Sequence, residues 1–81
     1  MKMKKKSQKA APQFAVCIDN SGYPASLALR KIYRVLRDEE AAQDGDLRVV
    51  DESGGDYLYP ARNFLVVALP KAVERALLKA S

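Results

Sequence analysis

Residues 51–64, D-E-S-G-G-D-Y-L-Y-P-A-R-N-F, constrain the fold of this chain more than any other segment. Ser53, Gly54 and Gly55 are the residue types that a tight reversal of the chain needs. An aromatic strand follows over residues 57–59, and Pro60 ends it because proline cannot donate a hydrogen bond to a sheet. The run therefore predicts a hairpin turn, the second strand of that hairpin and a further turn.

Outside that run, alternating apolar and polar residues predict strands at residues 14–19, 47–50 and 64–68. In the first of these strands we expect Phe14, Val16 and Ile18 to face the core, with Ala15 and Cys17 on the opposite face. The core of so short a chain has to come from its larger apolar side chains. The expected core residues are Phe14, Val16, Ile18, Ile32, Val35, Leu47, Val49, Leu58, Phe64, Val66, Leu69, Val73 and Leu77.

Residues 27–38 fit two structures. Leu29, Ile32 and Leu36 have the spacing of an amphipathic helix, which would place arginines on its opposite side. The segment I-Y-R-V within it is rich in residues that favour strands. We favour a strand over residues 30–37, because a barrel built from the other four strands needs a fifth. The helical alternative would leave an open sheet and a basic ridge available to nucleic acid.

Two helices are expected after that segment. Residues 38–45 have an N-cap aspartate and a terminal glycine, which predicts a short connector helix. Pro70 occupies a first helical position, and Val73, Ala76 and Leu77 form an apolar stripe after it. This terminal helix is too short to be stable alone, so we expect it to pack on the barrel or on a second copy, which would make a homodimer.

The chain is expected to have three parts, which are a disordered lysine-rich tail at residues 1–13, a β-barrel at 14–69 and a C-terminal helix at 70–81. The net charge is +4, but the tail alone contributes +5 through Lys2, Lys4, Lys5, Lys6 and Lys9, and the rest of the chain carries −1. The apolar stretch after the tail is too short for a signal peptide or a membrane span, and the chain has one cysteine. We therefore expect a cytoplasmic protein with no membrane partner.

The residue types give little support for catalysis. Histidine is absent, and Cys17 has apolar neighbours, so we expect a structural thiol rather than a nucleophile. Asp51, Glu52 and Asp56 fit no calcium-binding spacing and are expected to cap the turn. Gly54 and Gly55 lack the following lysine of a phosphate-binding loop. The sequence thus predicts no enzyme, no cofactor and no metal site.

A non-catalytic binding module for a protein or peptide is the function that the sequence favours, because tyrosine and arginine supply contact area with a polar group. The alternative for the tyrosines is that they close the small core. The candidate contact residues are Tyr23, Tyr57, Tyr59, Arg62 and Asn63. A second hypothesis is non-specific nucleic-acid binding through the tail lysines, the tyrosines, Arg30 and Arg34. Self-assembly through the terminal helix is the third.

Residues 57–66, Y-L-Y-P-A-R-N-F-L-V, resemble the final strand, 3₁₀ turn and closing strand of Src-homology-3 (SH3) domains. The resemblance implies a mainly β fold, a small five-stranded SH3-like barrel with a short connector helix and a C-terminal α-helix. It also implies groove positions at Pro60, Asn63 and Phe64, although the chain has no tryptophan and lacks the opening motif of that family. Over most of residues 14–78 the chain also resembles short uncharacterised bacterial proteins with an Asp-Glu-Ser-Gly-x-Asp-Tyr core.

Overall fold

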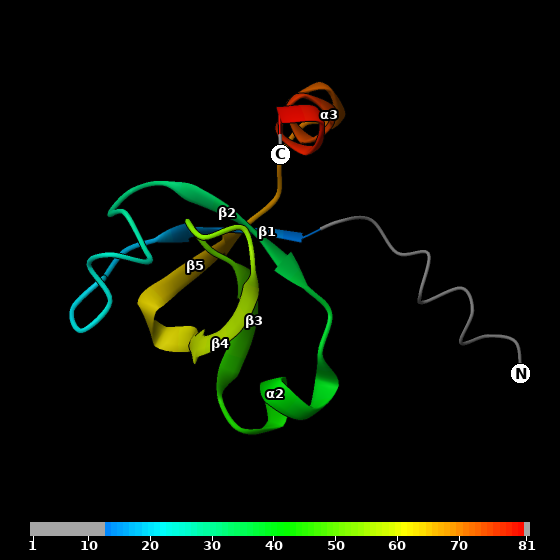
Figure 1. The fold of residues 1–81 in the computed structure, drawn as a ribbon. Helices are drawn as coiled ribbons and strands as arrows, with labels where there is room; N and C mark the ends of the chain where they lie inside the picture. The colour runs from blue at the N-terminus through cyan, green and yellow to red at the C-terminus, as the bar shows by residue number, and fades with distance from the viewer. Residues whose placement is uncertain (1–12, 81) are drawn as a thin grey trace, which may run out of the picture.

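The computed structural model describes residues 13–80, which form a mainly β domain with five antiparallel strands in one sheet. The predicted SH3-like barrel with a connector helix and a C-terminal helix is confirmed. The tail lysines lie outside the described residues, and Gln13, which we assigned to the tail, begins the first strand. In chain order, labelled as in Figure 1, the elements are β1 (Gln13–Cys17), β2 (Ile32–Leu36), α2 (Glu39–Gln43), β3 (Asp46–Val50), β4 (Asp56–Pro60), the 3₁₀ helix η1 (Ala61–Asn63), β5 (Phe64–Val67) and α3 (Lys71–Ala80).

The strand order β4-β3-β2-β1-β5 places two strands that are consecutive in sequence at opposite edges of the sheet. Only η1 joins β4 to β5, so these two edges have to approach each other. The sheet therefore curls into an open barrel rather than lying flat (Figure 1). Its free edges are β4 and β5, so five strands do not remove the edges as we expected.

The segment that fitted either a helix or a strand is a strand, β2. Tyr33 and Val35 are buried and Arg34 between them is exposed, which is the two-residue period of a half-buried strand. Tyr33 pairs with Ala15 in β1, and Val35 pairs with Val49 in β3. The helical alternative for residues 27–38, and the basic ridge that it implied, are therefore wrong.

The orientation of β1 is the reverse of our prediction. Ala15 and Cys17 are fully buried and belong to the core cluster, whereas Ile18 is 52% exposed. Phe14 is buried too, but it pairs with the exposed Arg34 and so lies on the other face of the sheet, which we call the outer face. The interior of a barrel this narrow is occupied by aromatic rings, so it has room only for small side chains from β1.

The core is smaller and more aromatic than predicted. Leu58 and Val66, both expected in the core, are 45% and 56% exposed because they lie on the two edge strands. Leu27, which comes from the loop between β1 and β2, is 1% exposed instead. The buried cluster consists of Ala15, Cys17, Leu27, Tyr33, Val35, Val49, Tyr59 and Phe64.

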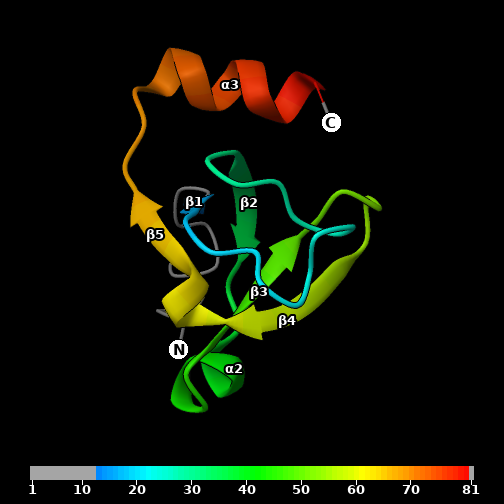
Figure 2. The ribbon, with the colours of Figure 1, turned by 90° about the vertical axis from the view of Figure 1, so that its left-hand side faces the viewer.

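The helices lie at opposite ends of the barrel, as Figures 1 and 2 show. The Asp38 side chain caps α2 by accepting a hydrogen bond from the Ala41 N–H, as expected. An extended segment leads from β5 to α3, which crosses above β1 and β2 (Figure 2). Leu77 and Leu78 of α3 face a groove together with Phe14. Val73, which we expected in the core, is 40% exposed.

The reversed orientation of β1 predicts opposite effects for two substitutions. Ala15→Leu forces a larger side chain into the filled interior and should lower the free energy of unfolding by about 1–3 kcal/mol. Ile18→Ala, at a half-exposed position, should change it by about 0.5 kcal/mol or less. Urea unfolding of both variants measures the difference. If Ile18→Ala costs more than Ala15→Leu, the original assignment of the faces is restored.

Candidate interaction surface

The turn between β3 and β4 is held by the carboxylate of Asp51, which is only 7% exposed. Its Oδ1 accepts hydrogen bonds from the Ser53 N–H (2.9 Å) and the Ser53 hydroxyl (2.6 Å), and its Oδ2 accepts one from the Tyr59 hydroxyl. Burial acts to raise the pKa of Asp51, but these hydrogen bonds hold it below its ordinary value. Asp51 therefore stays charged and ties the turn to a core tyrosine.

Glu52 ties the loop before β2 to the same turn. Its carboxylate accepts hydrogen bonds from Lys31 Nζ (2.7 Å) and from the Tyr33 hydroxyl, and its N–H donates to the Ser26 carbonyl (3.0 Å). The Tyr33 hydroxyl also accepts a hydrogen bond from the Ala28 N–H (2.7 Å). Burial, followed by the hydrogen bond to Glu52, raises the pKa of Tyr33 to about 12. The hydrogen bonds from Lys31 and Tyr33 lower the pKa of Glu52.

A groove of about 530 Å³ lies between α3 and the outer face of the sheet, and it ends at this turn. Its apolar lining comes from three strands and from the last part of α3. The apolar side chains that line the groove are Phe14, Ile32, Val50, Leu77 and Leu78. Lys31 and Glu52 border the groove and neutralise each other as an ion pair of 2.7 Å. The groove thus has an apolar interior and a polar end.

Arg34 also lines the groove, and its charge is available. It is exposed and makes no ion pair with any other residue between 13 and 80. Arg48 differs, since it contacts Asp38 at 2.7 Å and Asp56 at 3.1 Å. The groove therefore offers an approaching segment an apolar surface beside a cation that the described part of the chain leaves uncompensated.

The five residues predicted as a binding site have different roles. Tyr59 and Asn63 are 4% and 5% exposed and build the interior, so neither presents contact area. Tyr23 is half-buried, and its ring packs edge-on against Tyr59 with 5.0 Å between the centroids. Tyr57 is 56% exposed, and Arg62 is exposed on η1. The alternative that tyrosines close the core is correct for Tyr59 and Tyr33.

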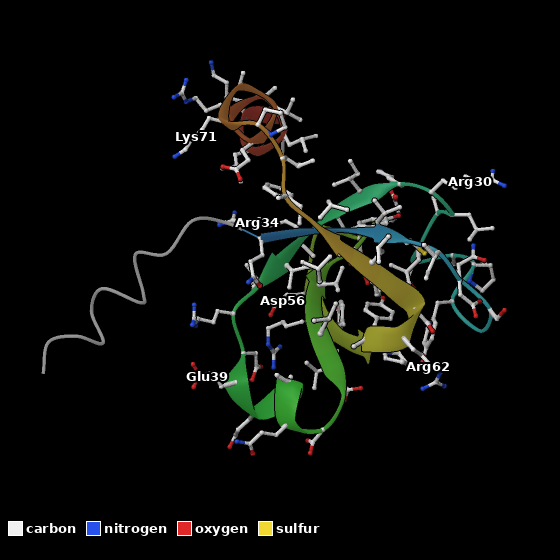
Figure 3. All side chains as sticks on the ribbon, turned by 180° about the vertical axis from the view of Figure 1, so that it is seen from behind. Arg30, Arg34, Glu39, Asp56, Arg62 and Lys71 are labelled. Atoms are coloured by element: carbon white, nitrogen blue, oxygen red, sulfur yellow. The ribbon has the colours of Figure 1, made fainter. Side chains whose placement is uncertain are left out.

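The residues of the nucleic-acid hypothesis do not form one patch in the described part of the chain. Arg30 and Arg34 are both exposed, but Figure 3 shows them on opposite sides of the molecule. Arg30 lies in the loop before β2 with a φ of 65°, whereas Arg34 lies beneath α3. Lys2, Lys4, Lys5, Lys6 and Lys9 are outside the described residues. Binding of nucleic acid therefore stays a hypothesis.

From the sequence we also considered a cysteine nucleophile, a metal site and a membrane span. Cys17 is a free thiol, fully buried in the core. Between residues 13 and 80, no three cysteine or acidic side chains are grouped so that they could hold a metal ion. No helix in the same range has the length and apolar character that crossing a membrane requires.

The groove was missed because we assigned the large apolar residues of the strands to one core. The signal was present in the sequence, since Phe14, Ile32 and Val50 are large apolar residues at positions that alternate with core residues. Strands with apolar residues on both faces are typical of sheets that are covered on both sides. Here the second cover is α3, and it covers the outer face only in part.

Comparison with known protein families, curated proteins and solved structures found no match for this chain. The resemblance to short bacterial proteins with the Asp-Glu-Ser-Gly-x-Asp-Tyr core stays a prediction. The case for a function therefore depends on the groove and on the edges of the sheet.

Replacing Tyr33 with phenylalanine tests the Glu52–Tyr33 pair. The variant loses the hydrogen bonds to Glu52 and Ala28, so the free energy of unfolding should fall by about 1–2 kcal/mol at neutral pH. Tyr57→Phe, at an exposed position, is the matched control and should cost far less. Urea unfolding at pH 7 measures both.

The same pair predicts a pH dependence. Because the pKa of Glu52 is lowered, its stabilisation is present above 4.5 and is lost as the pH falls below that value. Because the pKa of Tyr33 is raised, its stabilisation is present below 10 and is lost as the pH rises toward 12. Unfolding measured against pH should show both decreases, and Tyr33→Phe should flatten the alkaline one. An unchanged alkaline limb in that variant would contradict the assignment to Tyr33.

Proposed function

We propose that the protein is a non-catalytic interaction module that binds a segment of another protein in the groove beneath α3. The segment carries a large apolar side chain, which enters between Leu77 and Phe14, and a neighbouring aspartate or glutamate, which pairs with Arg34. The observation that carries the proposal is the combination of an apolar groove of about 530 Å³ with an arginine free of ion pairs to the described residues.

The size and lining of the groove support a ligand of this kind. Sites for small ligands typically occupy about 300–1,000 Å³ and are mainly apolar with a few oriented polar groups. The groove is within that range, but Lys31 and Glu52 already satisfy each other. An apolar side chain with one adjacent carboxylate therefore fits better than a polar metabolite that needs several hydrogen bonds.

The use of the polar groups in the interior supports a role in binding rather than in catalysis. The hydroxyls of Tyr33 and Tyr59 and the carboxylate of Asp51 are all occupied in hydrogen bonds that hold the turn. The chain has no histidine, and Cys17 is buried within the core. Histidine is thus missing from the sequence, and these buried hydroxyl, carboxylate and thiol groups are committed to the fold.

Selection from a random peptide library on the immobilised full chain tests the proposal. We expect recovered peptides to share a large apolar residue beside an aspartate or glutamate. Arg34→Glu should weaken their binding by about tenfold or more, because it replaces the attraction with repulsion. Fluorescence anisotropy with a labelled peptide measures the change.

Arg62→Glu provides the matched control, since Arg62 is also exposed and lies on the other side of the molecule (Figure 3). It should leave peptide affinity unchanged. Loss of binding in Arg62→Glu but not in Arg34→Glu would overturn the groove and favour the surface around η1. A library without any enriched motif, together with retention of an oligonucleotide by the full chain, would favour the nucleic-acid hypothesis instead.

A further inference from the structure

The backbone of β5 presents hydrogen-bonding groups that its neighbour β1 does not use. Adjacent pairs in an antiparallel ladder alternate between hydrogen-bonded and non-bonded. The Ile18 N–H donates to the Asn63 carbonyl at 2.9 Å, so the next bonded pairs along the register are Val16–Leu65 and Phe14–Val67. The N–H and carbonyl of Val66 therefore point away from β1, toward the free edge.

The groups on either side of Val66 have the same direction. The Phe64 carbonyl and the Ala68 N–H also face the edge, while the Phe64 N–H is already bonded to the Ala61 carbonyl of η1. No other described residue accepts from the N–H of Val66 or Ala68. The free edge of β5 thus presents four backbone groups in order. They are an acceptor at Phe64, a donor and an acceptor at Val66, and a donor at Ala68.

The side chains along this edge are unprotected. Residues 64–69, F-L-V-V-A-L, are all apolar, and Leu65 and Val66 are 59% and 56% exposed on opposite faces of the strand. Soluble proteins usually protect a free edge with charged residues, proline or a bulge. An apolar and unprotected edge is therefore expected to be covered by another strand.

The other free edge of the sheet, β4, does have such protection. The Asp51 N–H bonds to the Gly55 carbonyl and the Ala61 N–H bonds to the Gly45 carbonyl, which fixes the alternation along the β3–β4 ladder. Asp56, Leu58 and Pro60 consequently present their backbone to the free edge. Pro60 has no N–H to donate, and Asp56 carries a charge. β4 is therefore a poor edge for strand addition, and β5 is the edge that remains.

We infer that β5 pairs antiparallel with β5 of a second copy of this chain, with Val66 of one copy opposite Val66 of the other. In this register the Val66 N–H of each copy donates to the Val66 carbonyl of its partner, and the Ala68 N–H donates to the Phe64 carbonyl. Both sheets become one continuous sheet about a two-fold axis. This inference does not depend on the peptide groove.

A second copy fits this edge because the segment is complementary to itself. At each position of the antiparallel register an apolar residue meets an apolar residue, with Leu65 opposite Val67 on the outer face. No charged side chain between Phe64 and Leu69 meets a like charge across the axis. The two-fold arrangement also puts both α3 helices on the same side of the joined sheet, where each presents the 40% exposed Val73.

The area of the contact sets its expected strength. A stable interface buries about 800 Å² on each partner, which is more than a strand of four residues covers. Leu65 and Val73 must add contact area from the outer face. We therefore expect a dimer that dissociates on dilution rather than a permanent one.

Sedimentation velocity of the full chain over a wide range of concentration tests the inference, with a dimer expected at the high end. Val66→Pro removes the N–H at the axis without removing a bond to β1, and should weaken dimerisation by about tenfold or more. Leu58→Pro is the matched control, since its N–H faces the β4 edge, and it should leave the dimer unchanged. Circular dichroism establishes that both variants are folded.

A measurement on the unaltered chain keeps the test decisive if a proline variant does not fold. Amide hydrogen exchange at Val66 and Ala68 should slow as the protein concentration rises, while exchange at Leu58 should not change. A monomer at every concentration overturns the inference, as does exchange at Val66 that is independent of concentration. A dimer that is lost in Val73→Asp but retained in Val66→Pro would assign the contact to α3. A dimer that is lost in Leu58→Pro would assign the contact to β4. Either result would overturn the inference.

Discussion

The hydrogen bond from the Tyr59 hydroxyl to the Asp51 carboxylate is the contact on which the rest of the barrel depends. A domain of this size has a small core, so a few polar contacts in the interior decide where its large side chains lie. Tyr59 is packed edge-on by Tyr23 at 5.0 Å and by Phe64 at 6.2 Å between ring centroids. The position of the turn therefore sets the position of the aromatic cluster, and the cluster in turn holds η1 and the start of β5.

The same turn explains why the loop between β1 and β2 is ordered without regular structure. Glu52 receives hydrogen bonds from Lys31 and Tyr33, and its N–H binds the Ser26 carbonyl. Leu27, next to Ser26, is thereby held in the core at 1% exposure. The two adjacent acidic residues thus have different partners, since Asp51 accepts a hydrogen bond from Tyr59 in the core and Glu52 contacts the loop between β1 and β2.

The elements of this fold were predictable because their signals are local. The glycine turn, Pro60, the cap at Asp38 and the β-forming residues of β2 each act within a few positions. The facing of β1 was not predictable in the same way, because both of its faces are apolar and hydrophobicity does not distinguish them. Side-chain volume distinguishes the two faces, since the interior holds the rings of Tyr33, Tyr59 and Phe64, and β1 adds only the small side chains of Ala15 and Cys17 to it. The same competition for space decides which tyrosines are accessible, because Tyr59, one of the predicted contact residues, is a core residue, whereas Tyr57 is 56% exposed.

Pro60 and Asp56 have a consequence beyond the end of one strand. A sheet with two open and mutually compatible edges can add copies head to tail without limit, which is the geometry of a fibre. Among the described strands, β5 presents the N–H and carbonyl of Val66, the Phe64 carbonyl and the Ala68 N–H, while β4 lacks the donor at Pro60 and presents a charge at Asp56. Strand addition on one side therefore creates no equivalent site on the other. An assembly that forms through β5 would therefore be finite, and the apolar edge of β5 would not lead to polymerisation.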